Sequence, residues 1–273
     1  MAMRQFRRLS LRTILLLAAT VTATGAGAAD VPVDVALVMA GDVSGSMTSG
    51  ELATQREGFA AAFHDPELVS AIHSGAIGRI AVTYVEWAGS GEQWVVVPWT
   101  VVADQQSSDA FGDRLVTAPA VRGSQTSLSN GLLFAARQFE TSGVVADRET
   151  IDVSGDGPNN AGPPIGRVRD FVVGKGITVN GLPLSPAADE KGPFAYLYDQ
   201  PGIDLDSYYR DCVIGGPGAF TMPVSSPAEV FDAIRRKLVL EIAALPARVI
   251  RADYIVPATP RVECVKSDRS ASP

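Results

Sequence analysis

The stretch "VDVALVMAGDVSGSM", residues 33–47, joins a buried strand to a polar loop. Its first part, residues 33–41, is a short and nearly all-apolar run, which is typical of a strand covered on both faces of a parallel sheet. The loop then places oxygen-bearing side chains on alternate positions, at Asp42, Ser44 and Ser46. Because carboxylates and hydroxyls are hard oxygen donors, this order indicates a cation site at the carboxyl end of the strand.

Strand and helix signals alternate along the rest of the chain. Apolar or β-branched runs predict strands at residues 33–41, 79–87, 94–102, 149–154, 177–184 and 219–224. Amphipathic patterns predict helices at residues 51–64, 108–115, 127–140, 165–173 and 226–244, with shorter helical pieces after Asp65 and within 204–213. This alternation predicts an α/β fold, a Rossmann-like, doubly wound and mostly parallel sheet with helices on both faces. Strands 79–87 and 94–102 are predicted to form a hairpin, and Pro98 predicts that the second is an antiparallel edge strand.

The last predicted helix, 226–244, has a basic cluster in its middle. Its apolar residues Val230, Ile234 and Leu238 recur every four positions and mark the buried side. Arg235-Arg236-Lys237 are therefore expected together on the solvated side of this helix.

Residues 1–29 have the pattern of a secretory signal peptide. A basic start is followed by an apolar stretch, 14–21, and by the small residues that precede a cleavage site at Ala28 or Ala29. The apolar stretch is shorter than the roughly 20 residues that span a bilayer. We therefore expect a periplasmic or secreted protein without a membrane span after cleavage. A retained N-terminal anchor is the alternative, and Arg7-Arg8 leaves both the general and the twin-arginine export routes open.

The exported part is expected to contain one domain, residues 30–245, followed by a tail, 246–273. Its two cysteines are Cys212 and Cys264. In an oxidising compartment a disulfide is the default expectation, and it would close a loop of about 50 residues, which corresponds to about 4 kcal/mol on the chain-entropy model. Two free thiols are the alternative, because spacing alone does not decide the pairing.

The charge balance excludes two classes of partner. The whole chain has a formal charge of −7, and the first 29 residues hold four arginines and no acidic residue, so the remainder is four units more negative, at −11. An acidic surface argues against nucleic acid and against anionic membrane, and it is compatible with cation binding.

Two further polar clusters accompany Asp42, Ser44 and Ser46. One is "GSQTSLSNG", residues 123–131, which contains Thr126, and the other is Asp156-Gly157 after the 149–154 strand. If strands 33–41 and 149–154 are neighbours, all three clusters meet at the carboxyl edge of the sheet. The donors suit Mg²⁺, with Ca²⁺ and Mn²⁺ as alternatives. The candidate ligands are Asp42, Ser44, Ser46, Thr126 and Asp156. Each is also explained, taken alone, as a turn or helix-capping residue.

In this order, the three clusters resemble the metal-ion-dependent adhesion site (MIDAS) of von Willebrand factor A (vWA) domains. "GRIAVTYVEWAG", "IDVSGDGPNN" and "YYRDCVIGGPGAF" further resemble a group of exported bacterial proteins of that fold with uncharacterised function. The resemblance implies that Ser44, Ser46 and Thr126 ligate the metal, that Asp42 and Asp156 contribute directly or through water, and that a partner's carboxylate takes the open position. Two residues depart from the vWA pattern: Gly41 stands in place of an apolar residue, which is expected to loosen the strand end, and Gly155 in place of a threonine.

The resemblance favours a non-enzymatic module that binds an acidic side chain of a partner protein through the metal. Two alternatives stay open, a metal-dependent hydrolase and a structural envelope protein whose metal only stabilises the fold. Enzyme signatures are missing from the sequence: it has no G-x-S-x-G elbow and no P-loop. The identity of the partner and the oligomeric state do not follow from the sequence.

Overall fold

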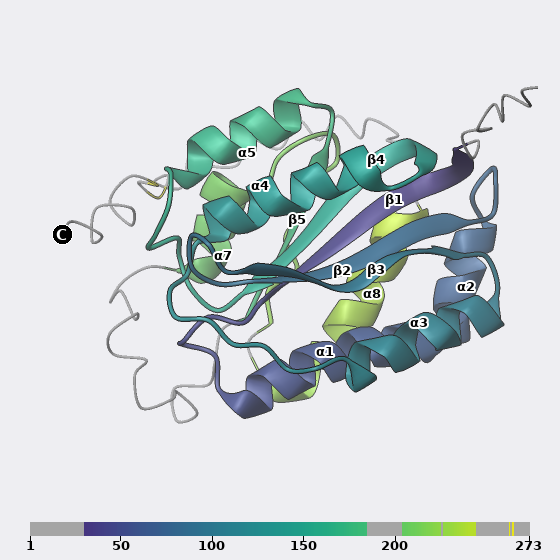
Figure 1. The fold of residues 1–273 in the computed structure, drawn as a ribbon, viewed down its shortest axis with the longest axis horizontal. Coiled ribbons are helices and arrows are strands. Elements are labelled where there is room, and N and C mark those ends of the chain that lie inside the picture. Colours follow the sequence, from purple (N-terminus) through teal and green to yellow (C-terminus); the bar gives the residue numbers. More distant parts are fainter. Residues whose placement is uncertain (1–29, 185–203, 225, 244–261, 263, 265–273) are drawn as a thin grey trace, which may run out of the picture.

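The computed structural model describes residues 30–184, 204–224, 226–243, 262 and 264. Their centre is a five-stranded sheet of order β3-β2-β1-β4-β5 (Figure 1). The strands are β1 (Val31–Asp42), β2 (Ile80–Trp87), β3 (Gln93–Val102), β4 (Val144–Gly155) and β5 (Thr178–Pro183). Only β3 runs antiparallel to its neighbour, and it lies at an edge. The predicted α/β class, the mostly parallel sheet and the edge position of the strand with Pro98 are therefore confirmed.

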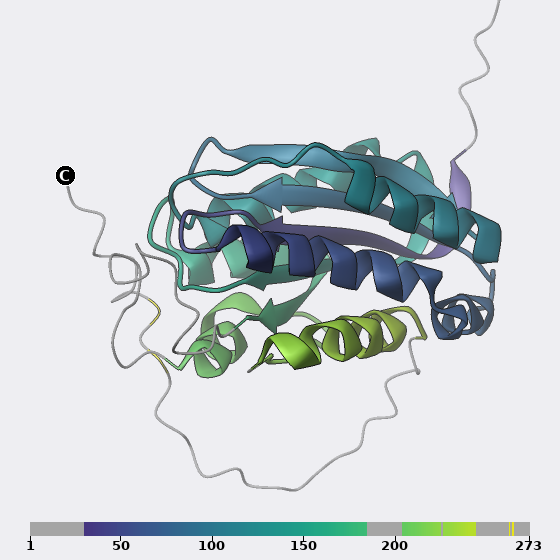
Figure 2. The same cartoon turned by 90° about the horizontal axis from the view of Figure 1, so that it is seen from below.

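Helices cover both faces of the sheet (Figures 1 and 2). One apolar cluster joins the sheet to α1 (Ser49–His64), α2 (Pro66–His73), α3 (Gln105–Thr117) and α8 (Val230–Ala243). The other joins it to α4 (Leu128–Gln138), the 3₁₀ turn Phe139–Thr141, α5 (Ile165–Gly174), the short α7 (Leu205–Tyr208) and η2 (Tyr209–Val213), a π-helical turn that continues α7. This arrangement is the doubly wound architecture that the alternation predicts.

The central position of β1 follows from its composition. Val35, Leu37 and Met39 point into the α1 side of the core, and the alternate residues, such as Ala36 and Val38, point into the α4 side. All of them are buried, and β1 has a parallel neighbour on each side. An uninterrupted apolar run is what a strand in this position requires.

Residues 219–224 do not form the predicted strand. They make only isolated bridges, from Thr221 to Gly181 and from Val224 to Leu184. Pro223 lies between the two bridges and has no N–H to donate, and the side chains from Ala219 to Pro223 are not buried. The prediction of a last core strand was therefore wrong, although the segment does run beside β5.

The basic cluster of the last helix divides between surface and core. A 3₁₀ turn, Pro227–Glu229, precedes α8. Arg236 is exposed, as expected, but Lys237 is completely buried. Position 237 follows Ile234 by three residues and thus shares the buried helix face, so the expectation that all three basic residues are solvated was wrong.

The structure joins Cys212 to Cys264 in a disulfide, which confirms the default expectation. The predicted signal peptide, 1–29, and most of the predicted tail, 246–273, lie outside the described residues. Within the described ranges, no helix combines the length and apolar character needed to cross a membrane.

Candidate metal centre

The parallel pairing of β1 with β4 brings the predicted site residues to one edge of the sheet, the edge formed by the carboxyl ends of its parallel strands. Gly41 lies opposite Ser154, so Asp42, the last residue of β1, and Asp156, the first residue after β4, leave the sheet side by side. This edge is on the left of Figure 1, where the connection from β1 to α1 begins. Polar residues at the carboxyl ends of neighbouring parallel strands are the common location of ligand sites in this architecture.

The segment before α4 reaches the same edge. The backbone N–H of Thr126 donates to Oδ1 of Asn160 (2.9 Å), and the N–H of Asn160 donates to the carbonyl oxygen of Thr126 (2.8 Å). This pair of hydrogen bonds ties Thr126 to the loop that follows Asp156.

Hydrogen bonds connect all five candidate ligands. The Thr126 hydroxyl donates to Oγ of Ser44 (3.3 Å), Oγ of Ser44 lies 3.1 Å from Oγ of Ser46, and the Ser46 hydroxyl donates to Oδ1 of Asp156 (2.7 Å). Oδ1 of Asp42 accepts the backbone N–H of Ser44 (2.7 Å). Three loops that are far apart in sequence therefore present two carboxylates and three hydroxyls in one continuous cluster.

The cluster is closed at its base and open on one side. Asp42 and Ser44 are fully buried and Thr126 is buried, whereas Ser46 and Asp156 are half-buried. Solvent or a ligand can therefore approach the cluster from the side of Ser46 and Asp156.

The two carboxylates are in surroundings that disfavour their charge. Burial, together with the negative charge of Asp156, raises the pKa of Asp42 well above its ordinary value. Burial, with a contribution from Glu51, raises the pKa of Asp156 to about 6, although the hydrogen bond from Ser46 acts in the opposite direction. Oδ2 of Asp42 is buried and has no hydrogen-bond partner within the described part of the chain. A cation beside these carboxylates would offset the repulsion between Asp42 and Asp156 and would give Oδ2 of Asp42 a partner.

The donor chemistry fits a hard divalent cation. In the described ranges no three His, Cys, Asp or Glu side chains come together as a metal site, so the hydroxyls are an essential part of this donor set. Carboxylate and hydroxyl oxygens suit Mg²⁺, Ca²⁺ or Mn²⁺ better than they suit a soft metal.

Gln55, on α1, holds the ends of β1 and β4 beside the site and was not predicted from the sequence. Its side-chain amide donates to the carbonyl oxygen of Asp42 (3.2 Å), and its Oε1 accepts the hydroxyl proton of Ser154 (2.8 Å). Gln55 precedes Phe59 and Phe63 at intervals of four and is as buried as they are. A polar residue in this apolar stripe was the available sequence signal.

Buried tyrosines explain both departures from the vWA pattern. A Cβ at position 41 would lie 2.4 Å from the hydroxyl oxygen of Tyr84, and a Cβ at position 155 would lie 2.8 Å from the hydroxyl oxygen of Tyr209. Gly41 pairs with β2 and with β4, so the strand end is not loosened. Burial, together with the charges of Asp42 and Asp156, raises the pKa of Tyr209 well above its ordinary value, so its phenol is neutral.

Solved structures of vWA domains share this fold. A von Willebrand factor type A protein from Catenulispora acidiphila matches with a TM-score of 0.54 and 17% identity over 77% of this chain and 43% of that one. Proximal thread matrix protein 1 from the mussel byssus, in a structure with a zinc-occupied MIDAS motif, matches with a TM-score of 0.55 and 16% identity over 78% of this chain and 49% of that one. The pilus adhesin SpaC from Lactobacillus rhamnosus GG matches with a TM-score of 0.52 and 12% identity over 77% of this chain and 30% of that one.

These likenesses establish the fold alone, and the chain spans less than half the length of each of these proteins. No curated protein matches the sequence. The predicted resemblance to vWA-like proteins is confirmed at the level of the fold. Residues 32–246 match the family model described as "Protein of unknown function (DUF1194)", and the chain belongs to that family.

Proposed function

We propose that this chain is an exported, non-enzymatic module that binds a partner protein through a divalent cation. The single observation that supports it best is the hydrogen-bonded cluster of Asp42, Ser44, Ser46, Thr126 and Asp156, which joins three loops at the carboxyl edge of the sheet.

The hydroxyls and the carboxylates of the cluster would have different roles in binding the cation. The hydroxyls of Ser44, Ser46 and Thr126 would act as neutral ligands, and the carboxylates of Asp42 and Asp156 would balance its charge directly or through water. When bound, the cation would supply an electrophilic position for a carboxylate. Two carboxylates neutralise a charge of +2, so a further carboxylate from a partner is a favourable ligand. The half-buried side at Ser46 and Asp156 is where that acid would enter.

The relatives of known structure support a divalent cation and an extracellular role. The mussel byssus protein has a MIDAS motif occupied by zinc, and SpaC is a pilus adhesin. The disulfide is typical of an oxidising compartment, in agreement with the signal-peptide pattern of residues 1–29.

The histidines give no support for an enzyme. The sequence has two, His64 and His73. His64 lies against Asp109 (Nδ1 to Oδ1, 3.1 Å), and His73 lies against the carbonyl oxygen of Ala103 (2.8 Å). His64 is the last residue of α1 and His73 the last residue of α2, and both contact α3 or the residue before its N-cap. Neither is therefore placed as a general base for the candidate metal centre.

A competition experiment tests the proposed function. The chain, immobilised in Mg²⁺, is expected to capture an envelope protein that is released by a chelator and by a glutamate-containing peptide, but not by the same peptide with glutamine. Ser44→Ala is expected to abolish capture. Ser70→Ala is the matched control, because Ser70 is an exposed serine on α2, the helix that leads into the amino end of β2. Capture that survives both the chelator and Ser44→Ala contradicts the proposal, and turnover of phosphoesters lost in Asp42→Ala would favour the hydrolase.

A further inference from the structure

Tyr209 is a buried polar residue that the metal cluster does not include. It is the first residue of η2 and has no exposed surface. Its hydroxyl oxygen has no hydrogen-bond partner within the described residues. A buried O–H group without a partner costs free energy, so its position calls for an explanation.

The second oxygen without a partner, Oδ2 of Asp42, lies beside the same backbone position. A Cβ placed on Gly155 would be 2.8 Å from the Tyr209 hydroxyl oxygen, 2.9 Å from Oδ2 of Asp42 and 3.2 Å from Cζ2 of Trp87. The two oxygens therefore flank the bare backbone of Gly155. One belongs to an O–H donor and the other to an acceptor, so the pair is chemically complementary.

We propose that Tyr209 is a positioning residue of the candidate metal centre: when the cation is bound, its free phenol O–H turns to donate to Oδ2 of Asp42 and fixes the orientation of that carboxylate toward the hydroxyl cluster. The inference rests on the proposed metal site. Oδ1 of Asp42 already accepts the backbone N–H of Ser44, so a second bond at Oδ2 removes the remaining rotational freedom of the carboxylate. Hydrogen bonds of this kind orient metal ligands in proteins.

The preceding residue supports the same site. The hydroxyl oxygen of Tyr208 accepts the backbone N–H of Asn159 (3.1 Å), and Oδ1 of Asn159 accepts the N–H of Ser129 (2.9 Å). Asn159 is three residues beyond Asp156. The two consecutive tyrosines therefore approach the site from the same short segment, Tyr208 by its bond to the loop after β4 and Tyr209 at Gly155, beside Asp42.

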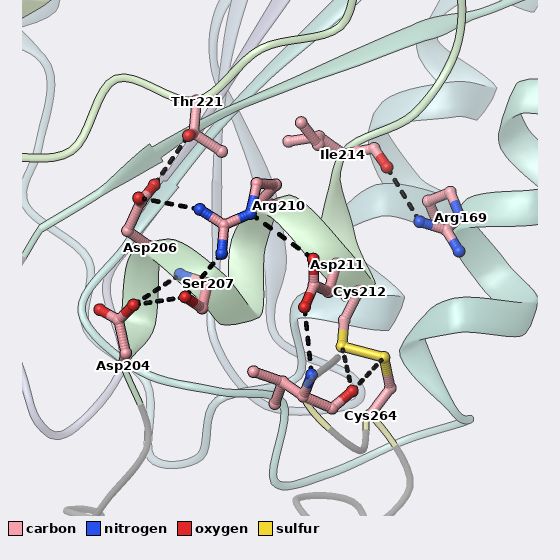
Figure 3. A network of polar contacts seen from close by, with 11 residues as sticks. Arg169, Asp204, Asp206, Ser207, Arg210, Asp211, Cys212, Ile214, Thr221 and Cys264 are labelled. Carbon is pink, nitrogen blue, oxygen red and sulfur yellow. Dashed lines mark hydrogen bonds and ion pairs between the residues drawn. A yellow bond between two sulfur atoms is a disulfide. The ribbon is translucent and has the colours of Figure 1, made fainter. Parts of the chain in front are cut away.

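Polar contacts and a disulfide hold η2 in place (Figure 3). Cys212 is bonded to Cys264, and Oδ2 of Asp211 accepts the N–H of Val262 (3.1 Å). Arg169 on α5 donates to the carbonyl oxygen of Ile214 at the end of η2 (2.9 Å). The segment that carries Tyr209 is thus attached to α5 and to the chain at Val262 and Cys264.

The N-terminal half of the segment is held as well. Arg210 pairs with the carboxylate of Asp206 and donates to the hydroxyl of Ser207 (2.7 Å). Asp206 also accepts the hydroxyl proton of Thr221 (2.8 Å). Because these contacts fix the backbone around Tyr209, the phenol has a defined position relative to Asp42, which is the condition for a positioning role.

The test compares Tyr209→Phe with Tyr84→Phe in the disulfide-bonded chain. Both tyrosines are fully buried, and both hydroxyls lack a partner in the described ranges, but Tyr84 packs on the α1 side of the sheet. We expect Tyr209→Phe to weaken Mg²⁺ binding about tenfold in calorimetry, and Tyr84→Phe to leave it within about twofold. The wild type is expected to show a tyrosine signal in the near-ultraviolet difference spectrum on adding Mg²⁺, and this signal is expected to disappear in Tyr209→Phe.

The outcomes distinguish a failure of this inference from a failure of the proposed function. Equal Mg²⁺ affinity of Tyr209→Phe and wild type, with affinity lost in Ser44→Ala, overturns the role of Tyr209 and leaves the metal site standing. Equal losses in both tyrosine variants assign the effect to packing and also overturn it. Absence of Mg²⁺ binding by the wild type overturns the metal site and the inference together. Thermal melting in chelator shows whether the variants are folded.

Discussion

The hydroxyl of Ser46 donates a 2.7 Å hydrogen bond to Oδ1 of Asp156, across 110 positions of sequence. The bond joins the loop after β1 to the loop after β4, and through Ser44 it continues to Thr126. The polar edge of the sheet is therefore one assembled unit, and substitutions within or beneath it have effects that the structure predicts.

Gly155→Ala is expected to weaken metal binding, because the new Cβ would lie 2.8 Å from the Tyr209 hydroxyl and 2.9 Å from Oδ2 of Asp42. We expect a loss of about 1–3 kcal/mol of stability from overpacking and a lower Mg²⁺ affinity. Gly157→Ala is the control, since a Cβ there meets nothing within 4 Å. Adding Tyr209→Phe should recover part of the lost stability, as measured in a double-mutant cycle by denaturant unfolding. Strict additivity of the two substitutions would contradict the proposed crowding.

Lys237→Met is expected to destabilise the fold strongly. The Lys237 ammonium pairs with Asp152 (Nζ to Oδ1, 2.6 Å) and with Glu241, and all three side chains are buried. Removing this ammonium leaves the buried carboxylate of Asp152 without its ion-pair partner, at a cost of about 3–5 kcal/mol. Arg236→Met is the matched control, because Arg236 is exposed and its pairing with Asp232 contributes about 0–1 kcal/mol. Equal unfolding free energies for the two variants would be inconsistent with the buried cluster.

The same cluster predicts that stability falls as pH rises. Burial, together with the charge of Asp152, raises the pKa of Glu241 from its ordinary 4.5 to about 8. The folded state therefore holds a proton that the unfolded state releases, and the contribution of Glu241 to stability is full below about pH 4.5 and is lost as pH rises through about 8.

Glu241→Gln isolates this contribution. Asn180, Lys237 and Asp152 contact or face the carboxylate, and Arg148 donates to the carbonyl oxygen of residue 241. Unfolding free energies of the wild type and the variant, measured in chelator from pH 5 to pH 8, should differ in slope, with the variant flatter. Parallel curves would show that Glu241 does not bind a proton in the folded state.

The disulfide is expected to stabilise both the fold and the metal centre. Replacing Cys212 and Cys264 by serine opens a loop of 52 residues and should lower stability by up to about 4 kcal/mol. Because Cys212 lies in η2 with Tyr209, Mg²⁺ affinity should fall as well. Addition of a thiol reductant should reproduce both effects in the wild type and change nothing in the double variant. A stability loss without any change in affinity would show that η2 keeps its position without the bond.

Much of the fold was predictable from local patterns. The apolar run of β1 marks a strand buried on both faces, and Pro98 marks an edge, because burial and a missing donor are properties of single segments. That Asp42, Ser44, Ser46 and Asp156 lie together was predictable because the parallel strands β1 and β4 deliver their loops to one end of the sheet, whereas Thr126 was included through the resemblance. The strand predicted at 219–224 was wrong because an apolar composition does not reveal that Pro223 interrupts the pairing of this segment.

The remaining features depend on contacts between distant segments. Tyr209 lies over Gly155, beside Asp42, only because η2 packs against β5 and is tied to Cys264. Asp152 reaches Lys237 only because α8 lies against β4. No spacing within one segment encodes these distances, although the helical register of Gln55 and Lys237 did place each on a buried face.

The central claim is that Asp42, Ser44, Ser46, Thr126 and Asp156 hold one divalent cation. Isothermal titration of the disulfide-bonded chain with Mg²⁺, Ca²⁺ and Mn²⁺ tests it most directly, with Ser44→Ala and the control Ser70→Ala titrated in parallel. We predict one bound ion per chain for the wild type and for Ser70→Ala, and a loss of at least about tenfold in affinity for Ser44→Ala. No saturable binding by the wild type, or undiminished binding by Ser44→Ala, would contradict the claim.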